Sequence, residues 1–124
     1  MASSGIMAGK RGLIMGVANE RSIAWGIAQS LASHGAELAF AYQGETFRKR
    51  VAPLVEPLKP AALIDCDVST PASIDAAFAE LALVWDGLDF LVHAIGFSDK
   101  NQLQGRYFDP TAENFAMTSN ISCY

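Results

Sequence analysis

The segment from residue 12 to residue 28 contains the residues best suited to bind a phosphate group. A short apolar run ends at Gly16, a polar loop follows, and Ser22 stands where a helix would begin. Gly16 permits a sharp turn in which a Cβ would obstruct both the backbone and an approaching ligand. Ser22 is a good N-cap residue, so we expect its hydroxyl to accept a hydrogen bond from an amide of the first helical turn. The remaining free amides and the helix dipole favour an anion there.

The glycine spacing differs from the common dinucleotide fingerprint. Gly16, Ser22 and Gly26 follow the pattern Gly-x5-Ser-x3-Gly rather than Gly-x-Gly-x-x-Gly. We expect Gly26, one turn into the helix, to let that helix pack closely on a sheet, as the third glycine of dinucleotide folds does. Taken alone, the segment is also compatible with an ordinary strand-to-helix turn that binds no nucleotide.

Composition places the chain among globular proteins. Of its 124 residues 51% are hydrophobic and 18% charged, and the net charge is −4. This size and composition predict one domain, and the acidic balance argues against nucleic acid as a partner. We find no signal peptide and no apolar run near the ~20 residues that span a membrane. Cys66 and Cys123 lie far apart, which suggests reduced thiols in the cytoplasm. We expect no metal site.

Short apolar runs alternate along the chain with longer segments of helical periodicity. The short runs are bounded by Gly, Pro or Asp and predict buried strands; they cover residues 12–15, 37–41, 61–64 and 88–92. The helical segments cover residues 23–33, 46–54, 71–85 and 111 to the end. This βαβαβαβα order predicts an α/β fold, a Rossmann-like doubly wound parallel sheet in a three-layer αβα arrangement. With about four strands the sheet would be incomplete.

Local signals support these boundaries. Gly35 fits the left-handed residue that ends the first helix, and Ser69 or Thr70 before Pro71 marks the start of the third. Within that third helix four apolar residues fall on one face, which we expect to be buried: Ile74, Phe78, Leu81 and Trp85.

Ligands of such sheets bind beyond the carboxyl ends of the strands, so the second strand end is informative. NAD enzymes usually place Asp or Glu there, whereas this chain has Gln43. Gln43 can bond a ribose hydroxyl without repelling a 2′-phosphate. Arg48, Lys49 and Arg50 could meet that phosphate, although a solvated helix face is the favoured interpretation. We therefore favour NAD over NADP.

The third and fourth strands also end in suitable groups. Asp67, with the backbone amide that follows it, could hold the amine and a ring nitrogen of adenine, or it could cap a turn. Beyond the fourth strand, Ala94 and Gly96 would let the backbone approach a ribose and nicotinamide. His93 is interpreted as a satisfied strand-end histidine rather than a base. Phe97 could line a pocket or cover the sheet edge.

Together these residues resemble the short-chain dehydrogenase/reductase superfamily. More narrowly, they are similar to the NADH-dependent enoyl-acyl-carrier-protein reductases of bacterial fatty acid synthesis. The resemblance covers nearly the whole chain in order, and it is carried by Gly16-Val17-Ala18, Ser22-Ile23-Ala24-Trp25-Gly26-Ile27-Ala28, Gly35-Ala36-Glu37-Leu38-Ala39-Phe40, Tyr42-Gln43, Cys66-Asp67-Val68, His93-Ala94-Ile95-Gly96-Phe97, Gln102-Leu103 and Ile121-Ser122-Cys123-Tyr124.

The resemblance implies a role for each matching position. The pyrophosphate and its ribose side would lie against Gly16, Ser22 and Ile23, and the adenosine half against Gln43, Asp67 and Val68. Ile95 and Gly96 would border the nicotinamide ribose, while Phe97 and Ser98 would line the acyl substrate. It further implies NADH as cofactor, an acyl-carrier-protein-bound trans-2-enoyl substrate, and a cytoplasmic homotetramer.

The catalytic pair that the resemblance implies, a Tyr-x6-Lys, is not assigned to any residue here. Tyr42 and Lys49 have this spacing, but Tyr42 would lie on the adenine side, far from the nicotinamide. We therefore interpret residues 1–124 as the N-terminal dinucleotide-binding half of a single domain whose C-terminal half is absent. Two alternatives remain: a relative that reduces ketones, disfavoured because its usual Asn-Ala-Gly run is missing, and a non-catalytic NAD-binding module.

Overall fold

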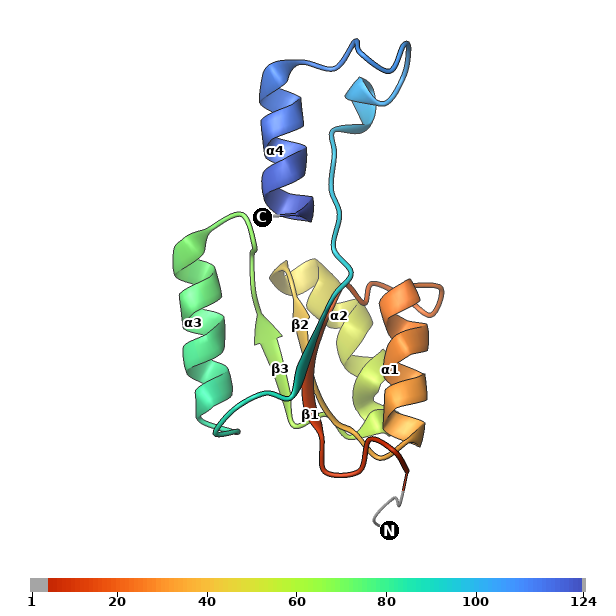
Figure 1. Cartoon of the computed structure of the whole chain (residues 1–124), viewed down its shortest axis with the longest axis vertical. Coiled ribbons are helices and arrows are strands. Elements are labelled where there is room, and N and C mark those ends of the chain that lie inside the picture. The colour runs from red at the N-terminus through yellow and green to blue at the C-terminus, as the bar shows by residue number, and fades with distance from the viewer. Residues whose placement is uncertain (1–4, 124) are drawn as a thin grey trace. The chain divides into compact units, whose positions relative to one another are not determined.

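The computed structural model describes residues 5–123, which form two compact units, residues 5–94 and residues 95–123. The first unit is a parallel four-stranded sheet with α1 and α2 on one face and α3 on the other (Figure 1). The expected three-layer α/β architecture is confirmed. The strands are β1 (Arg11–Met15), β2 (Glu37–Tyr42), β3 (Ala62–Asp65) and β4 (Phe90–His93), and the helices are α1 (Ile23–Ser33), α2 (Gly44–Val55), the short η1 (Glu56–Leu58) and α3 (Pro71–Ala82).

The order of strands across the sheet is β3-β2-β1-β4. The chain therefore moves outward from β1 through β2 to β3, then crosses back to place β4 on the other side of β1. Such a reversal creates a topological switch point, the place where open α/β sheets bind ligands. Met15 pairs with His93, so the switch point lies directly beyond these two residues.

The core lies between the sheet and the pair α1 and α2. Ile14 and Phe40 from the central strands are fully buried, as are Val51 and Val55 from α2. Helices cover both faces of the central strands, which explains why the sequences of β1 and β2 are continuous apolar runs rather than alternating apolar and polar residues. The first helix ends as expected, since Gly35 has a φ of +95°.

Three details of the predicted helices are wrong. The third helix ends at Ala82, three residues before the predicted end, although Trp85 is buried as expected. Phe78, predicted on the buried face, is 40% exposed, whereas Ala77 is buried. The second helix begins at Gly44, two residues before the predicted start.

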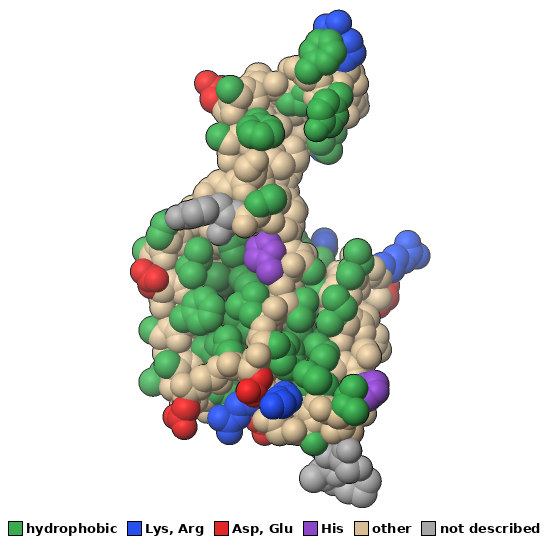
Figure 2. Space-filling view, in the orientation of Figure 1, with side chains coloured by type: hydrophobic (Ala, Val, Ile, Leu, Met, Phe, Trp, Pro, Cys, Tyr) green, Lys and Arg blue, Asp and Glu red, His purple; other side chains and the backbone are tan. Residues whose placement is uncertain are grey.

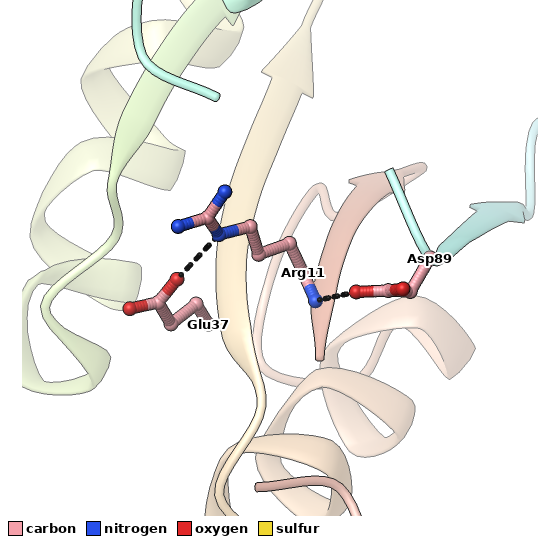
Figure 3. Close-up of polar contacts among 3 residues, drawn as sticks. All are labelled: Arg11, Glu37 and Asp89. Carbon is pink, nitrogen blue, oxygen red and sulfur yellow. Dashed lines mark hydrogen bonds and ion pairs between the residues drawn. The ribbon is translucent and has the colours of Figure 1, made fainter. Parts of the chain in front are cut away.

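At the amino end of the sheet, Arg11 of β1 bonds to Glu37 of β2 and to Asp89, the residue before β4 (Figure 3). Its backbone amide donates to Asp89 Oδ2 at 2.9 Å, and its Nε lies 3.1 Å from Glu37 Oε2. Both side chains of the ion pair are largely exposed, so the pair contributes only about 0–1 kcal/mol. This edge is opposite the strand ends at which ligands of such folds bind.

Hydrophobic side chains gather on the face of the first unit that Figure 2 shows. Exposed large hydrophobic residues on α3, on the turn after it and on the edge strand β4 include Phe78, Val84 and Leu91. In the described sheet β4 pairs with β1 alone, so its outer edge is unpaired.

The second unit contains the short η2 (Lys100–Gln102) and the helix α4 (Ala112–Ser122). Thr111 caps α4, since its Oγ1 accepts from the Asn114 amide at 3.1 Å. The segment before η2 is bound to the same helix: the amide of Phe97 donates to Ser122 Oγ at 3.1 Å.

Candidate functional site

Gly16 begins the loop after β1, and the structure requires a glycine there. Its φ is +110°, a conformation that side-chain-bearing residues rarely adopt. A Cβ at this position would lie 2.2 Å from the carbonyl oxygen of Ala94. The Ala94 amide in turn donates to Met15 O at 3.1 Å, which holds the backbone of Ala94 against the end of β1. The loop therefore begins at the switch point between β1 and β4 with a residue that only glycine can provide.

Ser22 occupies the N-cap position of α1, but its hydroxyl does not bond the first helical turn as expected. Its Oγ instead accepts from the amides of Ala18, at 2.9 Å, and Asn19, at 3.1 Å. The prediction was right about the position of the cap and wrong about its partner. The hydroxyl bonds within the loop and leaves the helix terminus without a side-chain cap in the part of the chain that the structure describes.

The uncapped helix terminus presents amides to a ligand. The amides of Trp25 and Gly26 bond to the Ser22 carbonyl, whereas those of Ile23 and Ala24 have no acceptor among residues 5–123. Ile23 is 79% exposed although it is apolar, whereas Ala24 is buried. Two free amides at a helix N-terminus, beside a glycine turn, can hold an anion such as a diphosphate.

Gly26 does not have the predicted packing role. It is exposed, and a Cβ built on it would meet nothing within 4 Å among the residues described. The residues of α1 that face the sheet are Ala24, Trp25 and Ala28. Alanines, rather than the glycine, allow this helix to lie close to the strands.

The tips of β2 and β3 are joined to each other. The Cys66 amide donates to Tyr42 O at 2.7 Å, and the Gly44 amide donates to Asp65 Oδ1 at 3.1 Å. Gln43 lies between these two links, exposed, with no side-chain hydrogen bond to the described residues. Its amide group is therefore free to bond a ligand at this edge.

Asp67 forms a turn through one carboxylate oxygen. Its Oδ1 accepts from the amide of Ser69, at 2.9 Å, and from the Ser69 hydroxyl, at 2.6 Å. These bonds lower the pKa of Asp67 below its usual value, so the carboxylate stays charged. Oδ2 and the Val68 amide have no partner within residues 5–123. The turn-capping interpretation is confirmed, and the pair of atoms needed for adenine is still available.

The Cys66 thiol beside this turn is buried, and burial raises its pKa above the usual value, with smaller contributions from the charges of Asp67 and Asp65. A protonated thiol at pH 7 is a poor nucleophile. It packs under the site rather than taking part in its chemistry.

Tyr42, the basic residues of α2 and His93 were also considered as candidates in the sequence. Tyr42 is buried in the core cluster, which supports its rejection as a catalytic acid. Arg48, Lys49 and Arg50 are exposed on α2, as a solvated helix face requires. His93 is also exposed at the end of β4, and its ring has no hydrogen-bond partner among the described residues, so its interpretation as a satisfied histidine rather than a base stays a prediction.

Ile95, Gly96, Phe97 and Ser98 belong to the second unit. Phe97 is 55% exposed and Gly96 is exposed, so neither is part of a core. Ser98 Oγ lies 3.0 Å from Thr118 Oγ1 and 3.3 Å from Asn114 Nδ2, both on α4. Sequence reasoning missed these helix partners, because no local pattern links residues 16 and 20 positions apart.

The chain agrees over most of its length with a known family. The family model described as enoyl-(acyl carrier protein) reductase matches residues 16–124. The chain belongs to the enoyl-(acyl carrier protein) reductase family. The match includes the loop, the strand tips and α4.

Curated members of the enoyl reductase family cover the chain almost completely. Enoyl-(acyl-carrier-protein) reductase (NADH) 2 of Rhizobium meliloti is 58% identical over 98% of the chain and 45% of its own length. The corresponding FabI of Rickettsia bellii is 48% identical, over 98% of the chain and 47% of its own length. The chain thus spans about half the length of these relatives.

Solved structures of the enoyl reductase family share the fold. The reductase from Anaplasma phagocytophilum, solved in complex with NAD, matches with a TM-score of 0.92 at 50% identity, covering 100% of this chain and 48% of that one. FabI from Candidatus Liberibacter asiaticus gives 0.93 at 50% identity, covering 99% and 47%. Within the residues described, every helix is too short or too polar to cross a bilayer.

Proposed function

We propose that this chain is the cofactor-binding half of an enzyme that reduces the 2,3-double bond of a trans-2-enoyl acyl-carrier-protein with a hydride from NADH. The observation that carries the proposal is the uncapped start of α1. Ser22 turns its hydroxyl to the loop and leaves the Ile23 and Ala24 amides without an acceptor among the described residues. Such a pair of amides fits the diphosphate of a dinucleotide.

The strand tips continue this site along the sheet edge. Gln43 would bond the adenine ribose, because its exposed amide lies at the end of β2. Asp67 Oδ2 would accept from the adenine amine and the Val68 amide would donate to a ring nitrogen. Support comes from the pairing of β2 with β3, which brings Gln43 and the Asp67 turn to adjacent strand ends.

The residues of the second unit would serve the reacting end. Ile95 and Gly96 would border the nicotinamide ribose, and Phe97 and Ser98 the acyl chain. Exposed Phe97 provides apolar surface for such a chain, and α4 fixes the Ser98 hydroxyl. When bound, NADH supplies the hydride that reduces the β-carbon.

Hydride addition to an enoyl thioester builds negative charge on the thioester oxygen. A hydrogen-bond donor must stabilise that oxygen as the charge develops. The family resemblance implies a tyrosine oriented by a lysine for this step, and we assign neither role within residues 1–124. Tyr42 is excluded because it is buried in the core cluster.

The same proposal includes one dinucleotide-binding domain, a cytoplasmic location and a homotetramer. Matches that cover 45–48% of the relatives support the assignment of this chain to part of a larger domain. The two free cysteines agree with a reducing compartment. Light scattering on the purified protein tests the tetramer.

The test is direct. Protein expressed from its complete reading frame is mixed with NADH and a trans-2-octenoyl thioester, and loss of NADH absorbance is followed. NADH affinity is measured in parallel for Gln43→Ala and for the control Gln29→Ala, an exposed glutamine on α1. We expect turnover, and weaker NADH binding only for Gln43→Ala. NADH binding without turnover would favour the non-catalytic module, and turnover of a ketone instead would favour the other branch of the superfamily.

A further inference from the structure

The proposed function assigns no role to Asp65, an acidic residue at the edge of the candidate site. It is the last residue of β3, and it lies opposite Tyr42 in the register of β2 and β3. Its Oδ1 accepts from the Gly44 amide at 3.1 Å. Gly44 is the first residue of α2 and follows Gln43 directly. The hydrogen bond to Gly44 therefore holds the Asp65 carboxylate beside the end of β2, next to Gln43 in the chain.

This position matters for the choice between NADH and NADPH. NAD enzymes of this fold class usually place an acid at the end of the second strand, where this chain has the neutral Gln43. We propose that Asp65 replaces that missing acid from the adjacent strand and makes the site selective for NADH over NADPH. The inference rests on the proposed function, because it requires the adenine ribose to lie beside Gln43.

Two effects of the Asp65 carboxylate act against a 2′-phosphate. Its negative charge repels a group that carries roughly two negative charges of its own at neutral pH. Its hydrogen bond also occupies the Gly44 amide, the backbone donor nearest to Gln43 along α2, which a phosphate would otherwise use. A ribose hydroxyl meets neither obstacle, since it is neutral and can bond to Gln43.

The basic residues of α2 act in the opposite direction. Arg48, Lys49 and Arg50 are exposed and form no ion pair among the described residues, so they would attract a phosphate. They begin four residues after Gly44, whereas Asp65 bonds Gly44 itself. The charge directly beside the predicted ribose position is therefore negative, and it decides the preference.

The experiment compares NADH and NADPH affinities of the protein expressed from its complete reading frame. Asp65→Asn removes the charge but keeps an oxygen for the Gly44 amide, and Asp65→Ser does the same with a smaller side chain. We expect both variants to bind NADPH about tenfold more tightly, with NADH affinity changed less than about twofold. Asp86→Asn is the matched control, because Asp86 is exposed and lies between α3 and β4, before the amino end of β4 and away from the carboxyl ends of the strands.

Each outcome decides the inference. A tenfold shift in the NADPH to NADH ratio for both Asp65 variants, and none for Asp86→Asn, supports it. If the wild type binds NADH but the ratio is unchanged in either folded variant, Asp65 is not the determinant and the proposed function stands. If both variants lose NADH and NADPH equally, Asp65 has a structural role only. A wild type that binds neither cofactor overturns the proposed function together with this inference.

Discussion

Gly16→Ala should be strongly destabilising, and the structure gives the size of the effect. Holding a side-chain-bearing residue at a φ of +110° costs about 1–2 kcal/mol. The new Cβ would also lie 2.2 Å from the carbonyl oxygen of Ala94, a residue whose amide bonds to Met15 O, so the backbone must shift at a cost of about 1–3 kcal/mol. Together we expect a loss of about 3 kcal/mol in the free energy of unfolding.

Urea denaturation followed by circular dichroism measures this loss, and a fall of about 1.5 M in the midpoint is expected. Gly26→Ala is the control, because Gly26 lies inside α1 with a helical φ and open space around its Cβ. Alanine there should stabilise the protein by about 0.5–1 kcal/mol. A Gly16→Ala midpoint within error of the wild type would refute the steric argument. Destabilisation by Gly26→Ala would show that this glycine packs against a surface outside the described residues.

Two further predictions concern titratable groups near the site. Asp67→Asn should reduce stability at pH 7; because the pKa of Asp67 is lowered in the folded state, the stabilisation is present above its usual value of 3.8 and is lost as pH falls through the folded pKa. The urea midpoints of wild type and variant should therefore converge in acid, and a gap that stays constant with pH would contradict this account. Cys66 is buried with a raised pKa whereas Cys123 is exposed, so iodoacetamide should modify Cys123 first, as peptide mass spectrometry would show. Faster labelling of Cys66 would mean that its strand tip opens readily.

The order of the elements could be predicted because each is marked by a local pattern. Apolar runs bounded by Gly, Pro or Asp became β1 to β4, and the segments between them became helices that cross the sheet. Gly16 was also predictable, since a strand that turns sharply at a glycine requires the backbone freedom that only glycine has. These features depend on residues close together in the sequence.

Features that depend on the elements packed around a helix or strand could not be predicted from local patterns. The helical period placed Phe78 on the buried face, but the face that the sheet covers is centred on Ala77 and Leu81. The bond from Gly44 to Asp65 joins residues 21 positions apart and follows from the register of β2 against β3. The partners of Ser98 on α4 are likewise set by how a loop folds onto a helix.

Ser22 shows why a correct local pattern can still mislead about chemistry. A serine hydroxyl at an N-cap can bond forward to the helix or back to the loop, and both partners lie within a few residues of it. Bonding forward would satisfy an amide of the helix and compete with any anion for it. In this structure the hydroxyl bonds back to Ala18 and Asn19. The Ile23 and Ala24 amides therefore have no acceptor within residues 5–123, and the serine contributes to the site by shaping the loop instead of capping the helix.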